Sequence, residues 1–372
     1  MRMKPYIYQK ENWPNFHWNN EEILGLIGKV RNLQGRIIGK MEVLGFELQN
    51  EAVLENLTLD VIKSTEIEGE ILNPDQVRSS IARRLGMNIS GLILSERNVD
   101  GVVDMMLDAT QKFTKRLTKE RLCDWHFSLF PTGRSGMYKI LVGQWRNDST
   151  GPMQVVSGAL GKEKVHFQAP NSENIDNEMS NFLEWFNTNE NIEPVIKASI
   201  AHLWFITIHP FEDGNGRIAR ALTDLLLARA DGISQRFYSM SSQIRVERKI
   251  YYDILEKTQQ GNLDITNWIK WFLNCLLDAL EASNITLEKV MQKHKFWNLN
   301  SILIQNERQQ LMLNKLLDGF EGKLTSSKWA KITKCSPDTA LRDIQDLIKK
   351  GILRKEMAGG RSTNYELISL KE

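Results

Sequence analysis

The sequence has few cysteines and no long apolar run. Its three cysteines, Cys123, Cys275 and Cys335, are far apart and form no Cys-x-x-Cys pair. An odd number of dispersed cysteines argues against a disulfide framework and against a zinc site, and it favours a reducing compartment. The sequence also contains no run of about 18 apolar residues and no apolar signal segment. We therefore expect a cytoplasmic protein that makes no contact with a membrane.

The sequence also lacks an excess of charge of either sign. The chain has 48 basic and 46 acidic residues, so the whole molecule is not an electrostatic nucleic-acid binder, and any such role must be local. Neither a Walker A lysine motif nor a kinase glycine loop is present, which makes a metabolic kinase a poor interpretation. With 372 residues, of which 41% are hydrophobic, the chain can bury two or three domain cores.

Helical periodicity dominates the sequence, which predicts a mainly α protein. Apolar residues recur at mixed spacings of three and four in the segments Asn20–Asn50, Val99–Leu117, Ile175–Asn187, Val195–Ile208, Ile218–Ala230, Ile265–Leu280 and Gln305–Leu317. The clearest exception is Met153–Gln168, where two short β-prone runs are separated by glycines. This segment is predicted to be a β-hairpin.

The tail of the chain has the pattern of a winged helix-turn-helix. A short helical run, the turn Thr333–Ser336 and a longer helical run, Pro337–Lys350, are followed by two short β-prone stretches around Ala358–Gly360. Thr325–Asn364 contains nine Lys or Arg and four Asp or Glu, a local charge of +5. Such modules bind DNA, dock proteins or mediate homodimers, and the sequence leaves these alternatives open.

The stretch His209–Arg220, HPFEDGNGRIAR, links two apolar helical segments. Gly214, Asn215 and Gly216 stand where the second helix begins, and a glycine-rich helix N-terminus presents backbone N–H groups and partial positive charge to an anion. Arg217 and Arg220, three residues apart, would extend this anion site along a polyphosphate. A capped turn with surface arginines is the structural alternative, and the complete set of polar and glycine positions disfavours it.

Phosphate chemistry also needs a metal and a base. Asp213 abuts the predicted anion site and suits Mg²⁺, which takes few protein carboxylates and completes its shell with water and phosphate oxygens. The imidazole of His209 can accept a proton near neutral pH from a hydroxyl that attacks phosphorus. His126 and His202 are interpreted as packed core histidines.

At these residues the chain resembles the Fic family, whose signature is H-P-F-x-[D/E]-G-N-G-R-x-x-R. The resemblance covers roughly Leu92–Leu280 and includes GQWR at Gly143–Arg146. It implies a mainly α fold: an N-terminal helical region at residues 1–90 and a Fic core with a small hairpin flap at 91–290. The tail, 291–372, would be the winged helix-turn-helix domain.

The resemblance further implies transfer of AMP from ATP to a serine, threonine or tyrosine hydroxyl of a protein, including self-modification, with Mg²⁺. His209 would be the general base, Phe211 a core anchor and Asp213 the metal ligand. ATP would contact the phosphate site and the flap; the residues implied are Gly214, Asn215, Gly216, Arg217, Arg220, Val156, Ser157, Gly158, Tyr251 and Tyr252. The flap would align the target by strand addition. Paired tyrosines on a helix are also common core residues, and Gln259 stands where relatives often have an asparagine.

A second motif lies upstream. Ser64–Gly69, STEIEG, matches the inhibitory pattern [S/T]-x-x-x-E-[G/N] of the family. Ser64 and Glu68 are four residues apart and would share one helix face, from which Glu68 would pair with Arg220 and block the γ-phosphate contact. Gly69 would end the helix. Helical spacing would direct Glu66 and Glu70 to other faces, away from the site.

The leading hypothesis is an autoinhibited protein adenylyltransferase. Removal of AMP in the same site, with the inhibitory glutamate positioning a water, is one alternative. A regulator that senses nucleotide and binds DNA through its tail is the other. The stretch Trp13–Asn19 resembles an uncharacterised N-terminal domain that often precedes Fic cores, and it carries no evident chemistry.

Overall fold

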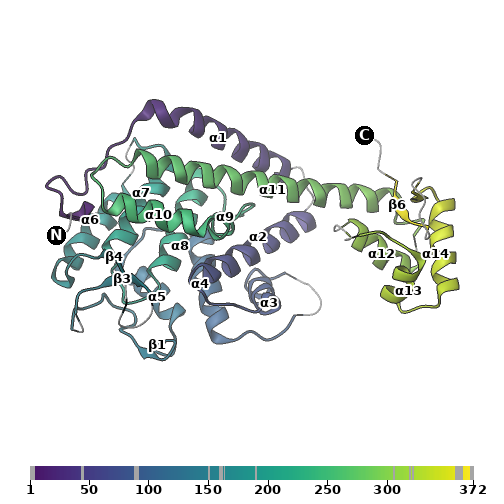
Figure 1. Cartoon of the computed structure of the whole chain (residues 1–372), viewed down its shortest axis with the longest axis horizontal. Helices are drawn as coiled ribbons and strands as arrows, with labels where there is room; N and C mark the ends of the chain where they lie inside the picture. The colour runs from purple at the N-terminus through teal and green to yellow at the C-terminus, as the bar shows by residue number, and fades with distance from the viewer. Residues whose placement is uncertain are drawn as a thin grey trace. The chain divides into compact units, whose positions relative to one another are not determined.

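The computed structural model describes residues 5–42, 46–87, 92–149, 151–158, 162, 164–188, 191–304, 306–317, 320, 322–356 and 363–368. It divides into two compact units, residues 1–283 and 284–372. The N-terminal region that the sequence separates at residue 90 packs into the same unit as the expected core, whereas the limits of the tail domain stay a prediction. Short strands accompany a largely helical fold, which confirms the predicted mainly α class (Figure 1).

The first unit is built almost entirely from helices. In chain order these are the 3₁₀ helix η1 (Ile7–Gln9), α1 (Asn20–Glu42), α2 (Phe46–Ile67), α3 (Pro74–Arg84), α4 (Arg97–Gln111), α5 (Lys119–Leu129), the 3₁₀ helix η2 (Ser172–Asn174), α6 (Ile175–Asn187), α7 (Pro194–Ile208), α8 (Asn215–Asp231), α9 (Met240–Val246) and α10 (Arg248–Gln259). The long helix α11 (Thr266–Asn300) begins in this unit and ends in the second. The predicted segment Ile175–Asn187 coincides with α6.

The helices α7 and α8 pack against each other at the centre of the first unit (Figure 1). Every residue of α7 from Val195 to Ile208 is buried, as expected of a helix that is apolar on all sides. Pro194 occupies its first turn, where no N–H is needed, and the Glu193 carboxylate accepts the N–H groups of Val195 and Ile196. The two central helices therefore form a rigid base for the turn between them.

The N-terminal helices pack onto this centre through α2. The sequence predicts one helix over Asn20–Asn50, whereas the structure has α1 ending at Glu42 and α2 beginning at Phe46, with 43–45 outside the described residues. α2 packs against α3 and α9, and also contacts α8. The end of α2 is held by Arg248, whose Nε donates to the carbonyl of Ile67 at 2.7 Å.

Two small antiparallel hairpins belong to the first unit. β1 (Arg134–Ser135) pairs with β2 (Tyr138–Lys139), and β3 (Gln154–Ser157) pairs with β4 (Lys164–Gln168). The β3–β4 pair confirms the predicted hairpin, and its register shifts between Val155 and Val156. Residues 159–161 and 163, in its connection, lie outside the described residues.

The second unit has its own apolar core around Trp329. It contains α12 (Glu307–Leu317), α13 (Ser326–Thr333), α14 (Pro337–Lys349), β5 (Leu353–Lys355) and β6 (Tyr365–Leu367), and the two strands are antiparallel. Three residues separate α13 from α14, and Lys334 is left-handed with φ 53°. The turn predicted around Ala358–Gly360 falls on 357–362, outside the described residues. In the part of the chain that the structure describes, no helix is both long and apolar enough to span a bilayer.

Candidate active site

The link between α7 and α8 is a tight turn that contains two left-handed residues. α7 ends at Ile208, and His209 follows with φ 53°. Gly214 has φ 78° and directly precedes the first residue of α8. A Cβ atom at position 214 would lie 2.9 Å from the ring of Phe130, so conformation and space both require glycine there. The turn therefore fixes His209 relative to the N-terminus of α8.

The side chain of Asn215 closes this turn. Its Oδ1 accepts the backbone N–H of Phe211 at 3.0 Å, and its Nδ2 donates to the carbonyl of Phe211 at 2.8 Å. Phe211 itself is fully buried, as predicted for a core anchor, and stacks on His126 with ring centroids 4.1 Å apart. Both polar ends of the Asn215 side chain therefore bind the turn itself, which gives this residue a structural role beside the predicted nucleotide contact.

His126 holds the turn from the other side. The N–H of Gly143 donates to Nδ1 at 3.2 Å, so Nε2 carries the ring proton and donates to the carbonyl of Asp213 at 3.2 Å. Burial lowers the pKa of His126 to about 4. This histidine is a buried residue, as expected, and it also positions the turn.

The ring of His209 is oriented so that one nitrogen can act as a base. Nδ1 lies 3.2 Å from the carbonyl oxygen of Ile206, to which its N–H donates. Nε2 then has a lone pair that can accept a proton. Burial, with a smaller contribution from the nearby Arg146 guanidinium, lowers the pKa of His209 to about 4. The imidazole is therefore neutral at pH 7, which is the form that a general base needs.

Arg146, from the Gly143–Arg146 stretch, ties the turn to the hairpin. Its buried guanidinium donates through Nε to the carbonyl of His209 at 2.8 Å and through Nη2 to the carbonyl of Pro170 at 2.5 Å. Nη1 pairs with Asp148 at 2.7 Å. One arginine thus connects the backbone of His209 with the residue that follows the end of the β3–β4 hairpin.

The first two turns of α8 carry two buried guanidinium groups. The side chains of Arg217 and Arg220 are 3% and 2% exposed. Among the residues that the structure describes, Nε of Arg217 and Nη1 of Arg220 have no hydrogen-bond partner. Buried charged donors without partners are costly, so these atoms are well suited to an anion bound at the N-terminus of α8. The phosphate site itself stays a prediction.

The end of α2 contacts Arg220. Nε of Arg220 donates to Ser64 Oγ at 2.9 Å, and Nη2 donates to Glu68 Oε1 at 2.7 Å. Gly69 has φ 88°, which turns the chain away directly after Glu68. A Cβ atom at Gly216 would lie 2.2 Å from Glu68 Oε1, so this carboxylate lies against the backbone of the predicted anion site. The expected contact between Glu68 and Arg220 is present, and its inhibitory effect stays a prediction.

The expectation that Glu70 points away from the site is wrong. Nη1 of Arg217 donates to Glu70 Oε2 at 3.0 Å. Helical spacing does not apply to Glu70, because α2 ends at Ile67 and the chain has turned before it. Glu66 does point elsewhere, since its carboxylate pairs with Lys63 at 2.9 Å. The turn after α2 therefore supplies one carboxylate to each arginine of the signature.

Asp213 lies where the sequence predicts a metal ligand. Its Oδ1 accepts the N–H of Gly214 at 2.5 Å, and its Oδ2 accepts the hydroxyl of Ser135, at the start of the β1–β2 hairpin. In the described part of the chain, no three His, Cys, Asp or Glu side chains gather to form a metal cluster. A single, partly exposed carboxylate beside the predicted phosphate site still fits Mg²⁺, which takes most of its ligands from water and phosphate.

The residues predicted on the flap lie on an exposed strand end. Val156 is 48% exposed, and Gly158 has φ 111°. Ser157 Oγ lies 2.6 Å from Nε2 of His166, whose Nδ1 lies 2.7 Å from Glu256 Oε2 on α10. The hairpin is thus fastened to α10, and its contact with a nucleotide stays a prediction.

The paired tyrosines of α10 have different environments. Tyr251 is 2% exposed, and its hydroxyl lies 3.0 Å from Nε2 of His202. Tyr252 is only partly buried, and the guanidinium of Arg248 stands 5.1 Å from its ring centroid. Gln259 is buried and donates to Thr207. Tyr251 therefore has a packing role, as the alternative interpretation stated, and Tyr252 is the better candidate for a ligand contact.

Sequence reasoning missed the residues that hold the site together. Ser135 binds the carboxylate of Asp213, His126 binds the carbonyl of Asp213, and Arg146 binds the carbonyl of His209. Their partners are mostly backbone carbonyls, which leave no mark in a sequence. GQWR was the one available signal, because it places an arginine before the hairpin.

The comparisons with known proteins agree with this geometry. Residues 116–227 match the Fic/DOC family. The chain carries a Fic domain. Residues 6–87 match a domain of unknown function, DUF4172. This agrees with the resemblance found at Trp13–Asn19.

Curated relatives of the Fic domain are named protein adenylyltransferases. The chain is 28% identical to protein adenylyltransferase fic-1 of Caenorhabditis briggsae, over 57% of this chain and 42% of the relative. It is 34% identical to protein adenylyltransferase Fic of Culex quinquefasciatus, over 28% of this chain and 19% of the relative. The chain thus spans less than half the length of these relatives.

A solved structure shares the fold. A Fic family protein from Desulfovibrio desulfuricans superposes with a TM-score of 0.54 and 19% sequence identity, covering 96% of this chain and 98% of that protein. At this identity the likeness supports the fold alone.

Because these histidines are buried, we predict that the folded protein loses stability in acid. Burial lowers the pKa of His126 to about 4 and that of His202 to about 3, whereas an unfolded histidine titrates near 6.5. Below pH 6.5 the unfolded chain binds protons that the folded chain refuses, so stability falls as the pH drops. The loss should reach on the order of 3 kcal/mol per histidine by pH 4.

Thermal melts between pH 7.5 and 4.5 measure this loss. Burial also raises the pKa of Asp224, and this shift increases stability as the pH falls. To isolate the contribution of His202, the test therefore compares the parent with His202→Gln. The variant should show the flatter decline of Tm with falling pH because its side chain cannot take up a proton. Parallel curves for the two proteins would contradict the assignment to His202.

Proposed function

We propose that this Fic domain transfers AMP from ATP to a hydroxyl of a protein and that the turn after α2 inhibits the transfer. The observation that carries the proposal is that a neutral imidazole and a helix N-terminus with two buried arginines flank the same turn. His209 has a free Nε2, and α8 begins six residues later with Arg217 and Arg220 in its first two turns. The curated relatives named as adenylyltransferases support the same reaction.

In the proposed reaction a hydroxyl oxygen of the target attacks the α-phosphorus of ATP. A new oxygen–phosphorus bond forms, the bond from the α-phosphorus to the bridging oxygen breaks, and pyrophosphate leaves. Nε2 of His209 takes the hydroxyl proton, while the Ile206 carbonyl holds Nδ1–H and so fixes the tautomer. Backbone N–H groups of Gly214–Gly216 and the two arginines hold the phosphates in line.

Asp213 would hold Mg²⁺ in this site. When bound, the ion would neutralise charge on the phosphate oxygens. Ser135 and the N–H of Gly214 orient the carboxylate for that purpose. The target segment would pair with an edge of the β3–β4 hairpin, a main-chain mode of recognition that demands little of the target's side chains.

Glu68 would inhibit by occupying the place of a phosphate. Its carboxylate binds Arg220 and lies against Gly216, at the end of the predicted anion site where the γ-phosphate is expected. ATP could then bind only with its phosphates displaced, and displacement from in-line geometry prevents transfer. A charge-assisted pair with a buried arginine can hold such a state by a few kcal/mol.

Glu70 would add a second, weaker inhibitory contact. It binds Arg217, but the Glu70 side chain is 49% exposed, against 30% for Glu68. Exposed pairs are worth up to about 1 kcal/mol. The two carboxylates therefore act on the same phosphate site with unequal strength.

Removal of AMP in the same site is the second candidate. The observation that favours it is the carboxylate of Glu68 within the predicted phosphate site, because a carboxylate there can orient a water for attack. Release of labelled AMP from a modified target, lost in Glu68→Gly, would identify this activity. The regulator that only senses nucleotide is disfavoured, because a sensor needs the phosphate site and no base.

The first prediction concerns the base. In a Glu68→Gly background, adding His209→Ala should lower AMP transfer by about 10² to 10⁴ and leave ATP affinity nearly unchanged, because His209 acts on the attacking hydroxyl. Transfer from labelled ATP gives the rate, and calorimetry gives the affinity. Transfer at the undiminished rate would exclude His209 as the base.

The second prediction concerns Glu68. Glu68→Gly should raise AMP transfer by about ten-fold or more, since each 1.4 kcal/mol of released inhibition is a factor of ten. Residue 68 follows the end of α2, so glycine there does not interrupt the helix. Glu68→Gln tests the charge alone. Glu66→Gln is the matched control, because its carboxylate binds Lys63, and it should leave the rate unchanged.

The third prediction separates Glu70 from Glu68. Glu70→Gln should raise transfer by about two- to five-fold, in keeping with a half-exposed ion pair, and should lower the KM for ATP. Steady-state rates over a range of ATP concentrations measure both effects. A fall in transfer would mean that Glu70 positions Arg217 for the reaction, and it would exclude the inhibitory role.

A further inference from the structure

The charge of the chain is divided unevenly between its two units. Residues 284–372 contain 16 Lys or Arg and 10 Asp or Glu, a net charge of +6. Residues 1–283 contain 32 and 36, a net charge of −4. The near-neutral total therefore conceals a basic second unit, and a basic unit favours a polyanionic partner.

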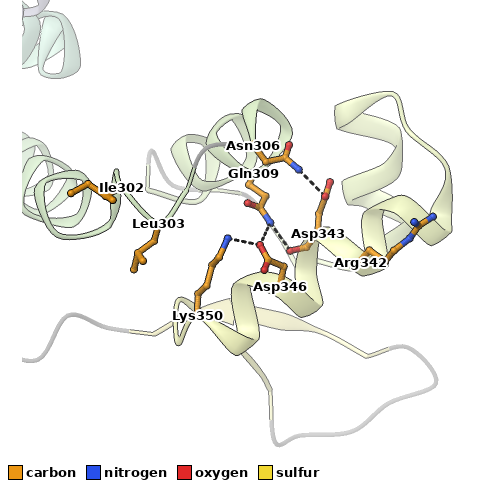
Figure 2. Close-up of a pocket in the computed structure, with 8 residues that line it drawn as sticks. All are labelled: Ile302, Leu303, Asn306, Gln309, Arg342, Asp343, Asp346 and Lys350. Carbon is orange, nitrogen blue, oxygen red and sulfur yellow. Dashed lines mark hydrogen bonds and ion pairs between the residues drawn. The ribbon is translucent and has the colours of Figure 1, made fainter.

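Two of the three acidic side chains of α14, Asp343 and Asp346, have partners within the second unit. Asp343 accepts Nε of Arg308 at 2.9 Å and Nδ2 of Asn306 at 3.0 Å. Asp346 accepts Nε2 of Gln309 at 2.9 Å and pairs with Lys350 at 2.6 Å. Figure 2 shows Asp343 turned toward Asn306, and Asp346 turned toward Gln309 and Lys350, in the pocket between α12 and α14. Their charge is therefore neutralised locally.

α14 also has an exposed face that carries a different set of side chains. Arg342 stands at the edge of this face: it is among the residues that line the pocket, and Figure 2 shows its guanidinium extending away from the other labelled side chains. The exposed residues of the helix lie at helical spacing along one stripe: Asp338, Leu341, Arg342, Gln345 and Lys349. The exposed lysines Lys331 and Lys334 precede the helix. Within the described residues, Lys331, Lys334, Arg342 and Lys349 make no ion pair.

We propose that the exposed stripe of α14 binds the major groove of double-stranded DNA. α14 has 13 residues, which is about 20 Å of helix, and the groove is about 12 Å wide and admits one helix. The three-residue turn after α13 matches the short turn of helix-turn-helix motifs. This arrangement presents the N-terminal half of the second helix to the bases.

Each residue type on the stripe has a suitable chemical partner in the groove. The guanidinium of Arg342 can bind a guanine edge, the amide of Gln345 can bind adenine, and Leu341 can contact a thymine methyl group. Lys331 and Lys334 would bind phosphates, which carry no sequence information but supply much of the affinity. Asp338 is the one exposed acid on the stripe and would disfavour phosphate contacts at its own position.

Binding of the full chain to fluorescein-labelled double-stranded DNA of mixed sequence, followed by anisotropy over a series of salt concentrations, tests the proposal. The parent should bind with an affinity that falls steeply as salt rises. Lys331→Ala with Lys334→Ala should lower the salt slope by about 2, one for each phosphate contact. Arg342→Ala should weaken binding by about five-fold or more.

Lys315→Ala is the matched control. Lys315 is exposed on α12, so its removal changes the net charge by the same amount without touching the stripe. It should leave affinity within about two-fold of the parent. Equal losses in Lys315→Ala and Arg342→Ala would reduce the effect to net charge and overturn the proposal, as would an absence of DNA binding by the parent. Circular dichroism melts of each variant exclude unfolding as the cause.

The test is independent of AMP transfer. DNA binding can be measured without ATP, and the tail variants change no residue of the α7–α8 turn. If the adenylyltransferase proposal fails, DNA binding by the parent is unaffected. A parent that binds a protein partner but no DNA would assign the stripe to protein docking and would refute this inference.

Discussion

The complete burial of α7 is the constraint on which the site depends. Every residue from Val195 to Ile208 is buried, so the turn that follows has little water to satisfy its polar groups. Asn215 bonds the backbone of Phe211, and Arg146 bonds the carbonyl of His209. Once these bonds are made, Nε2 of His209 remains as an acceptor beside a cationic helix end. The bonds that stabilise the turn therefore also leave this nitrogen available as the proposed base.

Buried positive charge explains why the end of α2 lies where it does. Arg217 and Arg220 are almost fully buried, and buried cations need an anion close by. Glu70 and Glu68 supply one carboxylate each, and a polyphosphate would supply the same charge when it binds. The proposed inhibition would therefore be coupled to stability, because the two carboxylates that would oppose the nucleotide also compensate the buried arginines.

The sequence predicts what depends on local pattern and fails where tertiary contacts decide. The apolar periodicity located α6 with its exact limits, and the glycine-separated runs located the β3–β4 hairpin. Apolar periodicity did not locate α3, which is short and polar. This helix begins where the side chain of Asn73 accepts the N–H groups of residues 75 and 76. Within the site, the pairing of Glu68 with Arg220 was predicted. The pairing of Glu70 with Arg217 was not, because helical spacing no longer applies after α2 ends.

The two units show that composition alone does not tell which charges can bind a partner. In α8 the side chains of Arg217 and Arg220 are buried, and the carboxylates of Glu70 and Glu68 bind them. In α14 the carboxylates of Asp343 and Asp346 are the groups held internally, and the basic side chains face outward. Internal ion pairs therefore neutralise arginines in the first unit and aspartates in the second. The formal charge of only +2 is therefore compatible with the two anion sites that we propose, one enclosed and one exposed.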